Sequence, residues 1–306
     1  MKEANGRVVK LSEHPLTGPL VAGAADASRR AGGYLRESLN HRFVYVVVSP
    51  RARGLSVGVN MNPDKKCQFN CVYCEVDRSA IGPEQKLDVT QMAGELTKTL
   101  EYIRSGRLRE LPAFRRVPDE LLQLRHVALS GDGEPTLAPE FPEALQAVMH
   151  VRALGGFPFF KLVLITNAVA LDLPTVRRGI AHLSKQDEVW AKLDGGTQAY
   201  LNRINGADVP LAKVLANILA LGRERPVVIQ SLFPAIGGQE PPLEEVEEYA
   251  RRLQELRQAG AQISLVQIYS ASRPTPRSEC THLPLRVLSG IAQKVRQATG
   301  LNVEVF

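Results

Sequence analysis

Three of the four cysteines in this 306-residue chain lie within one short segment, Cys67-Gln-Phe-Asn-Cys71-Val-Tyr-Cys74. A disulfide scaffold does not explain them, because three cysteines leave one unpaired and the chain lacks the marks of a secreted disulfide-rich domain. Three thiolates from one loop can instead bind three irons of a 4Fe-4S cluster. The fourth iron then stays open to a ligand that the protein does not supply.

A structural zinc site and a set of reactive thiols are the alternatives. Zinc in a structural site takes four protein ligands, the last of which usually come from a second C-x2-C or H-x3-H motif. No such motif follows: the next histidine is His126, and the one remaining cysteine is Cys280. The count of ligands therefore favours the iron-sulfur cluster.

The cysteine spacing, with Tyr73 directly before the last cysteine, resembles the signature of radical S-adenosylmethionine (SAM) enzymes. The resemblance implies that the amino and carboxylate groups of SAM chelate the open iron, and that the backbone of Tyr73 lies near the adenine. It implies reductive cleavage of SAM to methionine and a 5′-deoxyadenosyl radical. A low-potential electron donor of the flavodoxin or ferredoxin type would then be a partner.

Composition is that of a soluble globular protein with a substantial core, at 44% hydrophobic and 23% charged residues. No apolar run approaches the about 18 residues that span a bilayer. The first residues carry charge without a following apolar segment, so we expect no signal peptide. Clustered cysteines outside a disulfide framework predict a reducing, cytoplasmic location.

The formal net charge is +6 and the isoelectric point about 9.2. This surplus makes RNA one candidate substrate, although it fits an ordinary solvated surface as well. The densest basic stretch is Arg104, Arg107, Arg109, Arg115 and Arg116. It could contact a phosphate backbone, or it could be the exposed end of a helix.

Strand-like and helix-like segments alternate six times between Leu55 and Gly300. The expected strands are residues 55–60, 126–129, 161–165, 188–193, 227–230 and 263–268. The expected helices lie near 92–103, 139–151, 173–183, 211–221, 243–256 and 285–298. This alternation predicts parallel strands joined by helical crossovers, and the nearly continuous apolar runs fit strands with both faces buried.

Six such units are too few for a closed eight-fold barrel. We therefore expect an α/β fold, a partly open (β/α)6 TIM-like barrel, and the resemblance implies the same radical SAM fold. Further strands are expected at 43–48 and 303–306. Residues 1–50 are interpreted as an irregular N-terminal extension with one strand, and residues 51–306 as the barrel core.

Functional sites in such barrels form where the strands end. Gly131-Asp132-Gly133-Glu134 leaves the second expected strand. It looks like the family's Gly-Gly-Glu motif, which binds the amino group of SAM, with Asp132 in place of one glycine. Glycines let a backbone approach a ligand closely, and Glu134 adds an acceptor for an ammonium group. A glycine-rich turn with a solvated glutamate is the structural alternative.

Polar residues also end the later strands. Asn167 could bind ribose or the methionyl carboxylate, or cap a turn. Lys192 and Asp194 flank Leu193 and point the same way, so they predict a charged pair inside the barrel, with a catalytic or SAM-binding role or a purely structural one. Gln230 is a further candidate for SAM contact. Weaker candidates for SAM or substrate contact are Ser231, Gln267, Tyr269 and Arg273.

Cys280 follows the sixth expected strand and is interpreted as an incidental thiol, with hydrogen-atom donation or a role as a ligand as the alternatives. Four segments, 130–136, 191–197, 201–205 and 266–269, together resemble the branch of wyosine-type tRNA-modifying synthases. Those synthases bind a second cluster through extra N-terminal cysteines, whereas residues 1–66 contain none. The difference predicts another substrate.

The sequence thus predicts a radical SAM enzyme that abstracts hydrogen from a substrate it does not identify, with tRNA or nucleotide modification as one candidate. Two alternatives stay open. One is an activating enzyme for a glycyl-radical protein. The other is a non-catalytic RNA-binding protein stabilised by a metal with four protein ligands.

Overall fold

A computed structural model describes residues 39–76, 86–271, 275 and 277–306. Most of the predicted N-terminal extension, residues 1–38, lies outside the described residues, and so does Arg273. The predicted domain boundary at residue 50 therefore stays a prediction.

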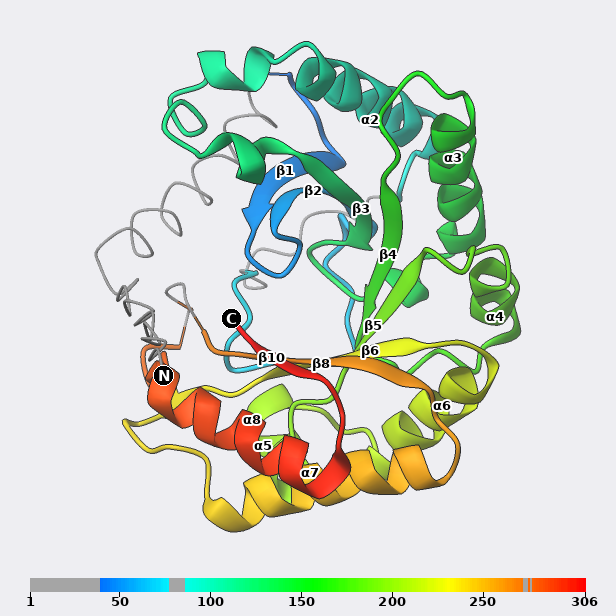
Figure 1. Cartoon of the computed structure of the whole chain (residues 1–306). Coiled ribbons are helices and arrows are strands. Elements are labelled where there is room, and N and C mark those ends of the chain that lie inside the picture. Colours follow the sequence, from blue (N-terminus) through cyan, green and yellow to red (C-terminus); the bar gives the residue numbers. More distant parts are fainter. Residues whose placement is uncertain (1–38, 77–85, 272–274, 276) are drawn as a thin grey trace, which may run out of the picture.

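One curled sheet of eight strands forms the centre of the molecule, in the order β1-β2-β3-β4-β5-β6-β8-β10 (Figure 1). β1 (Val44–Ser49) runs antiparallel to β2 (Gly54–Asn60), and every later neighbour pairs in parallel. The parallel strands after β2 are β3 (Leu124–Ser130), β4 (Lys161–Thr166), β5 (Glu188–Lys192), β6 (Val227–Leu232), β8 (Ile263–Tyr269) and β10 (Val303–Val305). β1 and β10 are the two edges, so the predicted partly open barrel is confirmed.

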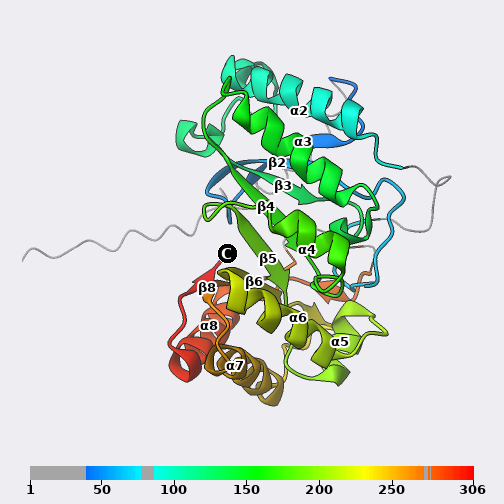
Figure 2. The same ribbon diagram turned by 90° about the vertical axis from the view of Figure 1, so that its right-hand side faces the viewer.

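Helices pack along the outer side of this sheet, as Figures 1 and 2 show. They are α2 (Val89–Arg104), α3 (Phe141–Ala153), α4 (Pro174–Ile180), α5 (Gln198–Asn205), α6 (Leu211–Glu224), α7 (Leu243–Gln258) and α8 (Leu285–Thr299). Short elements complete the described chain: η1 (Arg107–Glu110), η2 (Asp119–Leu122), η3 (Pro135–Leu137), and the paired β7 (Ala235–Ile236) and β9 (Cys280–Thr281).

Local sequence sets the ends of these helices. The Asp88 carboxylate accepts a hydrogen bond from Gln91 N–H, which satisfies an otherwise unpaired donor at the start of α2. α8 ends at Gly300, whose φ of 65° is readily adopted only by glycine. All six predicted helices are present. α5 was not predicted; the Thr197 side chain caps its start by accepting from Tyr200 N–H.

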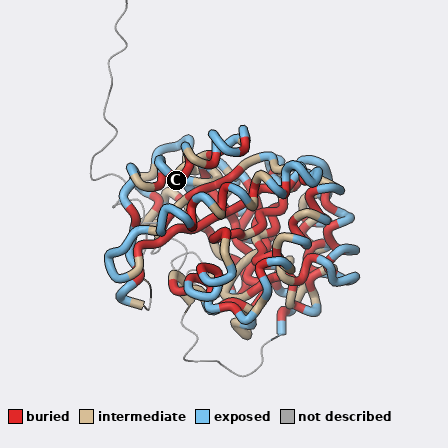
Figure 3. The backbone as a smooth tube through the Cα atoms, turned by 90° about the horizontal axis from the view of Figure 1, so that it is seen from below, coloured by how far each residue is buried: buried red, intermediate tan, exposed pale blue. Residues whose placement is uncertain are grey.

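Apolar side chains cover both faces of the sheet. The large core lies between strands and helices, and in Figure 3 its buried segments run inside the exposed helical surfaces. A second, smaller cluster of Ala128, Val163, Trp190 and Val228 fills part of the inner face. Polar residues take over that inner face toward the carboxyl ends of the strands, where the predicted site residues lie.

Part of the basic stretch is bound by the protein's own groups. Arg109 donates to three carbonyl groups of the following loop and pairs with Asp119. The guanidinium of Arg107 lies 4.7 Å from the centroid of the Tyr102 ring. Within the described parts of the chain, no helix is both long enough and apolar enough to cross a bilayer.

Candidate functional site

The cysteine loop (residues 61–76) leaves β2 and is held from two sides. On one side, Glu134 N–H donates to the carbonyl oxygen of Lys66 at 2.8 Å. On the other, Asn70 N–H donates to Asn205 C=O at 2.7 Å and Val72 N–H to Ile204 C=O at 2.8 Å. The glycine-rich turn after β3 and the last turn of α5 therefore fix the loop between them.

Hydrogen-bond donors point at two of the three sulfurs. Phe69 N–H lies 3.4 Å from Cys67 Sγ, and the Asn205 side-chain amide lies 3.2 Å from Cys71 Sγ. All three cysteines are half-buried and in no disulfide. N–H···S contacts stabilise the negative charge that sulfur carries in iron-sulfur clusters, so this donor set fits the predicted cluster.

As the side chains stand in this structure, neither the three sulfurs of the loop nor any other set of three His, Cys, Asp or Glu among the described residues is drawn together into a metal-binding group. The count of ligands in the sequence therefore remains the argument for a cluster over zinc.

The environment of Cys71 keeps its thiol protonated when no metal is bound. Burial raises the pKa of this thiol to about 11, and the Asp194 carboxylate adds to the rise. The positive charge of Lys192 and hydrogen bonds from Asn205 and Tyr73 oppose it. Metal binding must therefore displace a proton here.

The two glycines of the turn after β3 bring it against the cysteine loop. A Cβ on Gly133 would lie 2.2 Å from the Lys66 carbonyl oxygen, and one on Gly131 would lie 2.2 Å from Asn60 Oδ1. Gly131 also has a φ of +125°. Asp132 N–H donates to Asn60 Oδ1, and Asn60 Nδ2 donates back to Asp132. The structure thus shows these glycines admitting the end of β2 and the cysteine loop, while their contact with a ligand stays a prediction.

Glu134 is buried, so the alternative of a solvated glutamate is wrong. Its Oε1 accepts from the N–H and hydroxyl of Thr136 and from the Thr166 hydroxyl, and its Oε2 accepts from Asn167 N–H at 2.7 Å. Burial raises the pKa of this carboxyl, and the hydrogen bonds oppose the rise. Glu134 thereby fixes the backbone of Asn167, and the side-chain nitrogen Nδ2 of Asn167 lies 3.8 Å from Cys67 Sγ.

Lys192 and Asp194 form the predicted ion pair inside the barrel, with Lys192 Nζ 3.4 Å from Asp194 Oδ1. The Asp194 side chain is only 1% exposed. It also accepts from the Tyr73 hydroxyl, the Asn205 amide at 2.8 Å and Leu232 N–H at 2.8 Å. Burial lowers the pKa of Lys192, but the Asp194 carboxylate, the neighbouring Tyr269 and Cys71 and the hydrogen bond to Tyr269 together raise it above its usual value. Lys192 therefore stays charged.

Further polar side chains line the same inner face. Lys192 Nζ donates to the Tyr269 hydroxyl at 3.1 Å. Gln230 is the register partner of both Lys192 and Gln267, and its amide donates to Gln267 Oε1 at 3.2 Å. Both glutamines are buried. The fold thus brings Lys192, Gln230 and Tyr269 together, as expected for neighbouring strand ends.

Asn205 is the site residue for which the sequence predicted no role. It is fully buried at the end of α5, and its side chain contacts Cys71, Tyr73 and Asp194. The available signal was an asparagine directly before a glycine, Gly206, that ends a short helix. Cys280, by contrast, lies in β9, and burial raises the pKa of its thiol.

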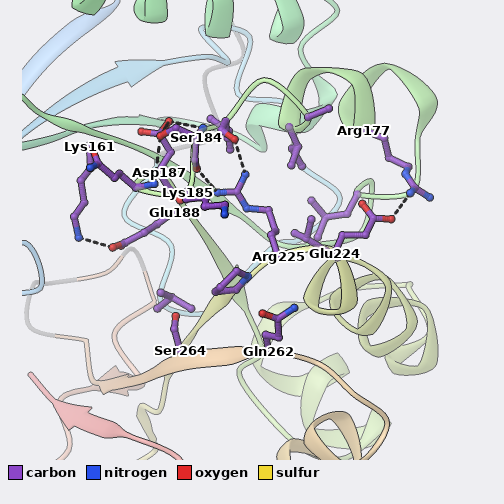
Figure 4. A pocket seen from close by; sticks show the side chains of 18 of the residues that line it. Lys161, Arg177, Ser184, Lys185, Asp187, Glu188, Glu224, Arg225, Gln262 and Ser264 are labelled. Carbon is purple, nitrogen blue, oxygen red and sulfur yellow. Dashed lines mark hydrogen bonds and ion pairs between the residues drawn. The ribbon is translucent and has the colours of Figure 1, made fainter.

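A cavity of about 1250 Å³ lies away from the cysteine loop, near α4, α6 and the amino ends of β4 to β6 (Figure 4). None of the predicted site residues lines it. Several of its polar groups bind one another: Arg177 pairs with Glu224, and Arg225 donates to the carbonyl groups of Leu183, Ser184 and Asp187. This cavity is therefore not the predicted site.

Known proteins resemble this chain in sequence and in fold. The chain is 31% identical to a UPF0026 protein of Synechocystis sp. over 59% of this chain and 60% of that one. It is 27% identical to a UPF0026 protein of Helicobacter pylori over 59% of this chain and 50% of that one. The chain thus matches only 50% to 60% of the length of these relatives.

Two solved structures share the fold. One is a radical SAM methyltransferase from Sphaerobacter thermophilus, with a TM-score of 0.60 at 16% identity, covering 86% of this chain and 68% of that one. The other is TYW1 with a lysine-pyruvate adduct bound, with a TM-score of 0.56 at 16% identity, covering 87% and 89%. The sequence profile of the radical SAM superfamily matches residues 61–253, from the cysteine loop into α7. The chain therefore belongs to the radical SAM superfamily of enzymes.

Proposed function

We propose that the protein is a radical SAM enzyme whose 4Fe-4S cluster is held by Cys67, Cys71 and Cys74. The observation that carries this proposal is the arrangement of three thiols on one anchored loop, with N–H groups directed at two of the sulfurs. When bound and reduced, the cluster supplies the electron that cleaves SAM and so yields the 5′-deoxyadenosyl radical.

The neighbouring turns would seat SAM. Gly131, Asp132 and Gly133 offer backbone groups beside the loop, and the backbone of Tyr73 would contact the adenine. Asn167, held by Glu134, would bind the ribose or the methionyl carboxylate. Because Glu134 Oε1 already accepts three hydrogen bonds, an ammonium group of SAM would approach the carboxylate at Oε2.

Residues on the inner face of the barrel would orient the reactants and exclude water. Lys192 offers a charge that can stabilise a carboxylate, while Asp194 holds Lys192 and Tyr73 in place. Gln230 and Tyr269 extend this polar face away from the cysteine loop. Such preorganised groups act strongly where water is excluded.

The proposal includes a low-potential electron donor of the flavodoxin or ferredoxin type and a cytoplasmic location, where the thiols stay reduced. A nucleotide or RNA remains a candidate substrate. Because the chain matches only part of its UPF0026 relatives, substrate and partners are inferred from this chain's own residues.

The test is an anaerobic assay. Protein reconstituted with iron and sulfide, reduced with dithionite and given SAM should form 5′-deoxyadenosine and show a SAM-dependent change in the EPR signal of the cluster. Cys71→Ala should abolish both, and Cys280→Ala is the matched control that should preserve both. Reductive SAM cleavage by the Cys71→Ala protein, or zinc in place of iron in the wild type, would overturn the proposal.

A further inference from the structure

A second, smaller cavity lies at the opposite end of the barrel from the cysteine loop. Its volume is about 430 Å³, within the range of small-molecule sites. The turn between β1 and β2 and the first residues of β3, β4 and β5 line it. We call it the basic cavity, because four of its lining residues are Arg51, Arg53, Arg125 and Lys161.

Positive charge exceeds negative charge in the basic cavity. Among the described residues that line it, Glu188 is the one acidic residue, and it already pairs with Lys161 at 2.6 Å and accepts from the Trp190 indole at 2.8 Å. Arg53 pairs with Glu304 on β10. Within the described ranges, Arg51 and Arg125 form no ion pair, so two guanidinium groups lack a counter-charge.

Arg51 joins the basic cavity to the polar inner face. Its guanidinium carbon lies 4.2 Å from the centroid of the Tyr269 ring, and Tyr269 accepts the hydrogen bond from Lys192. Arg51 Nε is buried and has no hydrogen-bond partner in the described structure. A buried donor without a partner is unfavourable, and an anion that accepts from the guanidinium would remove that cost.

We propose that the basic cavity binds the phosphate group of a small phosphorylated substrate through Arg51 and Arg125. The remainder of that substrate would extend past Tyr269 toward Lys192 and the cysteine loop. The identification of the ligand as the substrate rests on the proposed radical SAM function, whereas the phosphate site itself does not.

Two observations favour this ligand class. Arginine forms paired hydrogen bonds with phosphate oxygens, and a group with two negative charges suits two uncompensated guanidinium groups better than a single carboxylate does. The cavity has room for one small molecule, whereas nucleic acid is bound along extended basic surfaces. The exposed basic stretch that could have formed such a surface is partly bound to the protein itself.

Isothermal titration calorimetry of the full-length, cluster-reconstituted protein at low salt tests the site. Inorganic phosphate should bind the wild type saturably, and acetate should bind much more weakly. Arg51→Gln should weaken phosphate binding about tenfold or more, as expected for the loss of a charge-assisted hydrogen bond. The matched control is Arg115→Gln, which removes the same charge at an exposed residue outside the cavity and should bind phosphate as the wild type does.

Two results would overturn the proposal: no saturable phosphate binding by the wild type, or unchanged binding by Arg51→Gln. A 5′-phosphorylated single-stranded RNA should bind no more tightly than inorganic phosphate does. If the RNA binds more tightly, and binds Arg51→Gln equally well, the binding site is an outer surface and not the basic cavity. If circular dichroism shows that Arg51→Gln does not fold, Arg125→Gln replaces it, because Arg125 is exposed. If the protein binds phosphate but does not cleave SAM, the radical SAM function is rejected and the phosphate site is retained. If it cleaves SAM but does not bind phosphate, the phosphate site alone is rejected.

Discussion

The side-chain amide of Asn205 lies 3.2 Å from Cys71 Sγ and 2.8 Å from an Asp194 carboxylate oxygen. One buried amide thus joins the cysteine loop to the ion pair inside the barrel. The backbone carbonyl of the same residue accepts from Asn70 N–H in the loop. The last turn of α5 is therefore a part of the site and not only a connection between β5 and α6.

We expect Asn205→Ala to lower the reduction potential of the cluster. An N–H donor directed at a cluster sulfur stabilises the more negative, reduced state, so its loss should shift the potential downward by on the order of tens of millivolts. A redox titration of the reconstituted protein followed by EPR measures the shift. Asn202→Ala, at an exposed position of the same helix, is the control. Equal potentials for wild type and Asn205→Ala would contradict the expectation.

Periodicity in the sequence predicted most of the fold. The six strand-helix units and the shared direction of Lys192 and Asp194 follow from local patterns, because residues two apart on a strand face the same side. The cysteine spacing identified the loop that we predict to hold the cluster. These features depend on neighbours along the chain, which the sequence shows directly.

The partners of the site residues could not be predicted in the same way. Asn205 reaches Cys71 only because α5 docks on the cysteine loop, a contact between residues 134 positions apart. Glu134 is buried because the Thr166 hydroxyl and Asn167 N–H arrive from the next strand. The glycines at 131 and 133 suggested close approach of a ligand, but the sequence did not show that they also admit Asn60 of β2 and the Lys66 carbonyl group. Each of these outcomes is set by tertiary packing.

Gly133→Ala should impair cluster assembly. The new Cβ would lie 2.2 Å from the Lys66 carbonyl oxygen, which is backbone and must move away. Such overpacking typically costs about 1–3 kcal/mol, and here it would displace the residue directly before Cys67. We expect less iron bound per chain after reconstitution. Gly94→Ala, in α2 with nothing within 4 Å, is the matched control and should keep its iron. Full iron content in Gly133→Ala would show that the turn does not position the loop.

Asp194→Asn should be strongly destabilising. It leaves the Lys192 ammonium, with a side chain only 15% exposed, without its counter-charge. Breaking a buried pair in this way costs about 3–5 kcal/mol, whereas an exposed pair contributes about 0–1 kcal/mol. Urea unfolding measures the difference, and Glu224→Gln, which breaks an exposed pair with Arg177, is the control.

The double variant Lys192→Met/Asp194→Asn separates charge from packing in that pair. Because it removes both charges, it should regain part of the stability lost in Asp194→Asn. Equal stability of the single and double variants would mean that the uncompensated charge is not the cause of the loss.

The stability of the protein should fall between pH 6.5 and pH 4 because of His126. This side chain is buried and packs edge-on against Trp190, with ring centroids 5.3 Å apart. Burial lowers its pKa to about 4; nearby Glu188 opposes this, and Arg51 and Lys161 reinforce it. In that interval the unfolded chain binds a proton that the folded chain does not, so unfolding becomes easier as the pH falls, by up to about 3 kcal/mol.

His126→Phe, which keeps a ring but cannot be protonated, should flatten this part of the pH profile of the unfolding free energy. Some slope should persist, because burial also lowers the pKa of His41. Denaturant unfolding at several pH values measures the profile, with His150→Gln in an exposed position of α3 as the control. If the pH profile of His126→Phe matched that of the wild type, His126 would take up its proton in the folded protein. The amino end of β3 would then open to water before the chain unfolds.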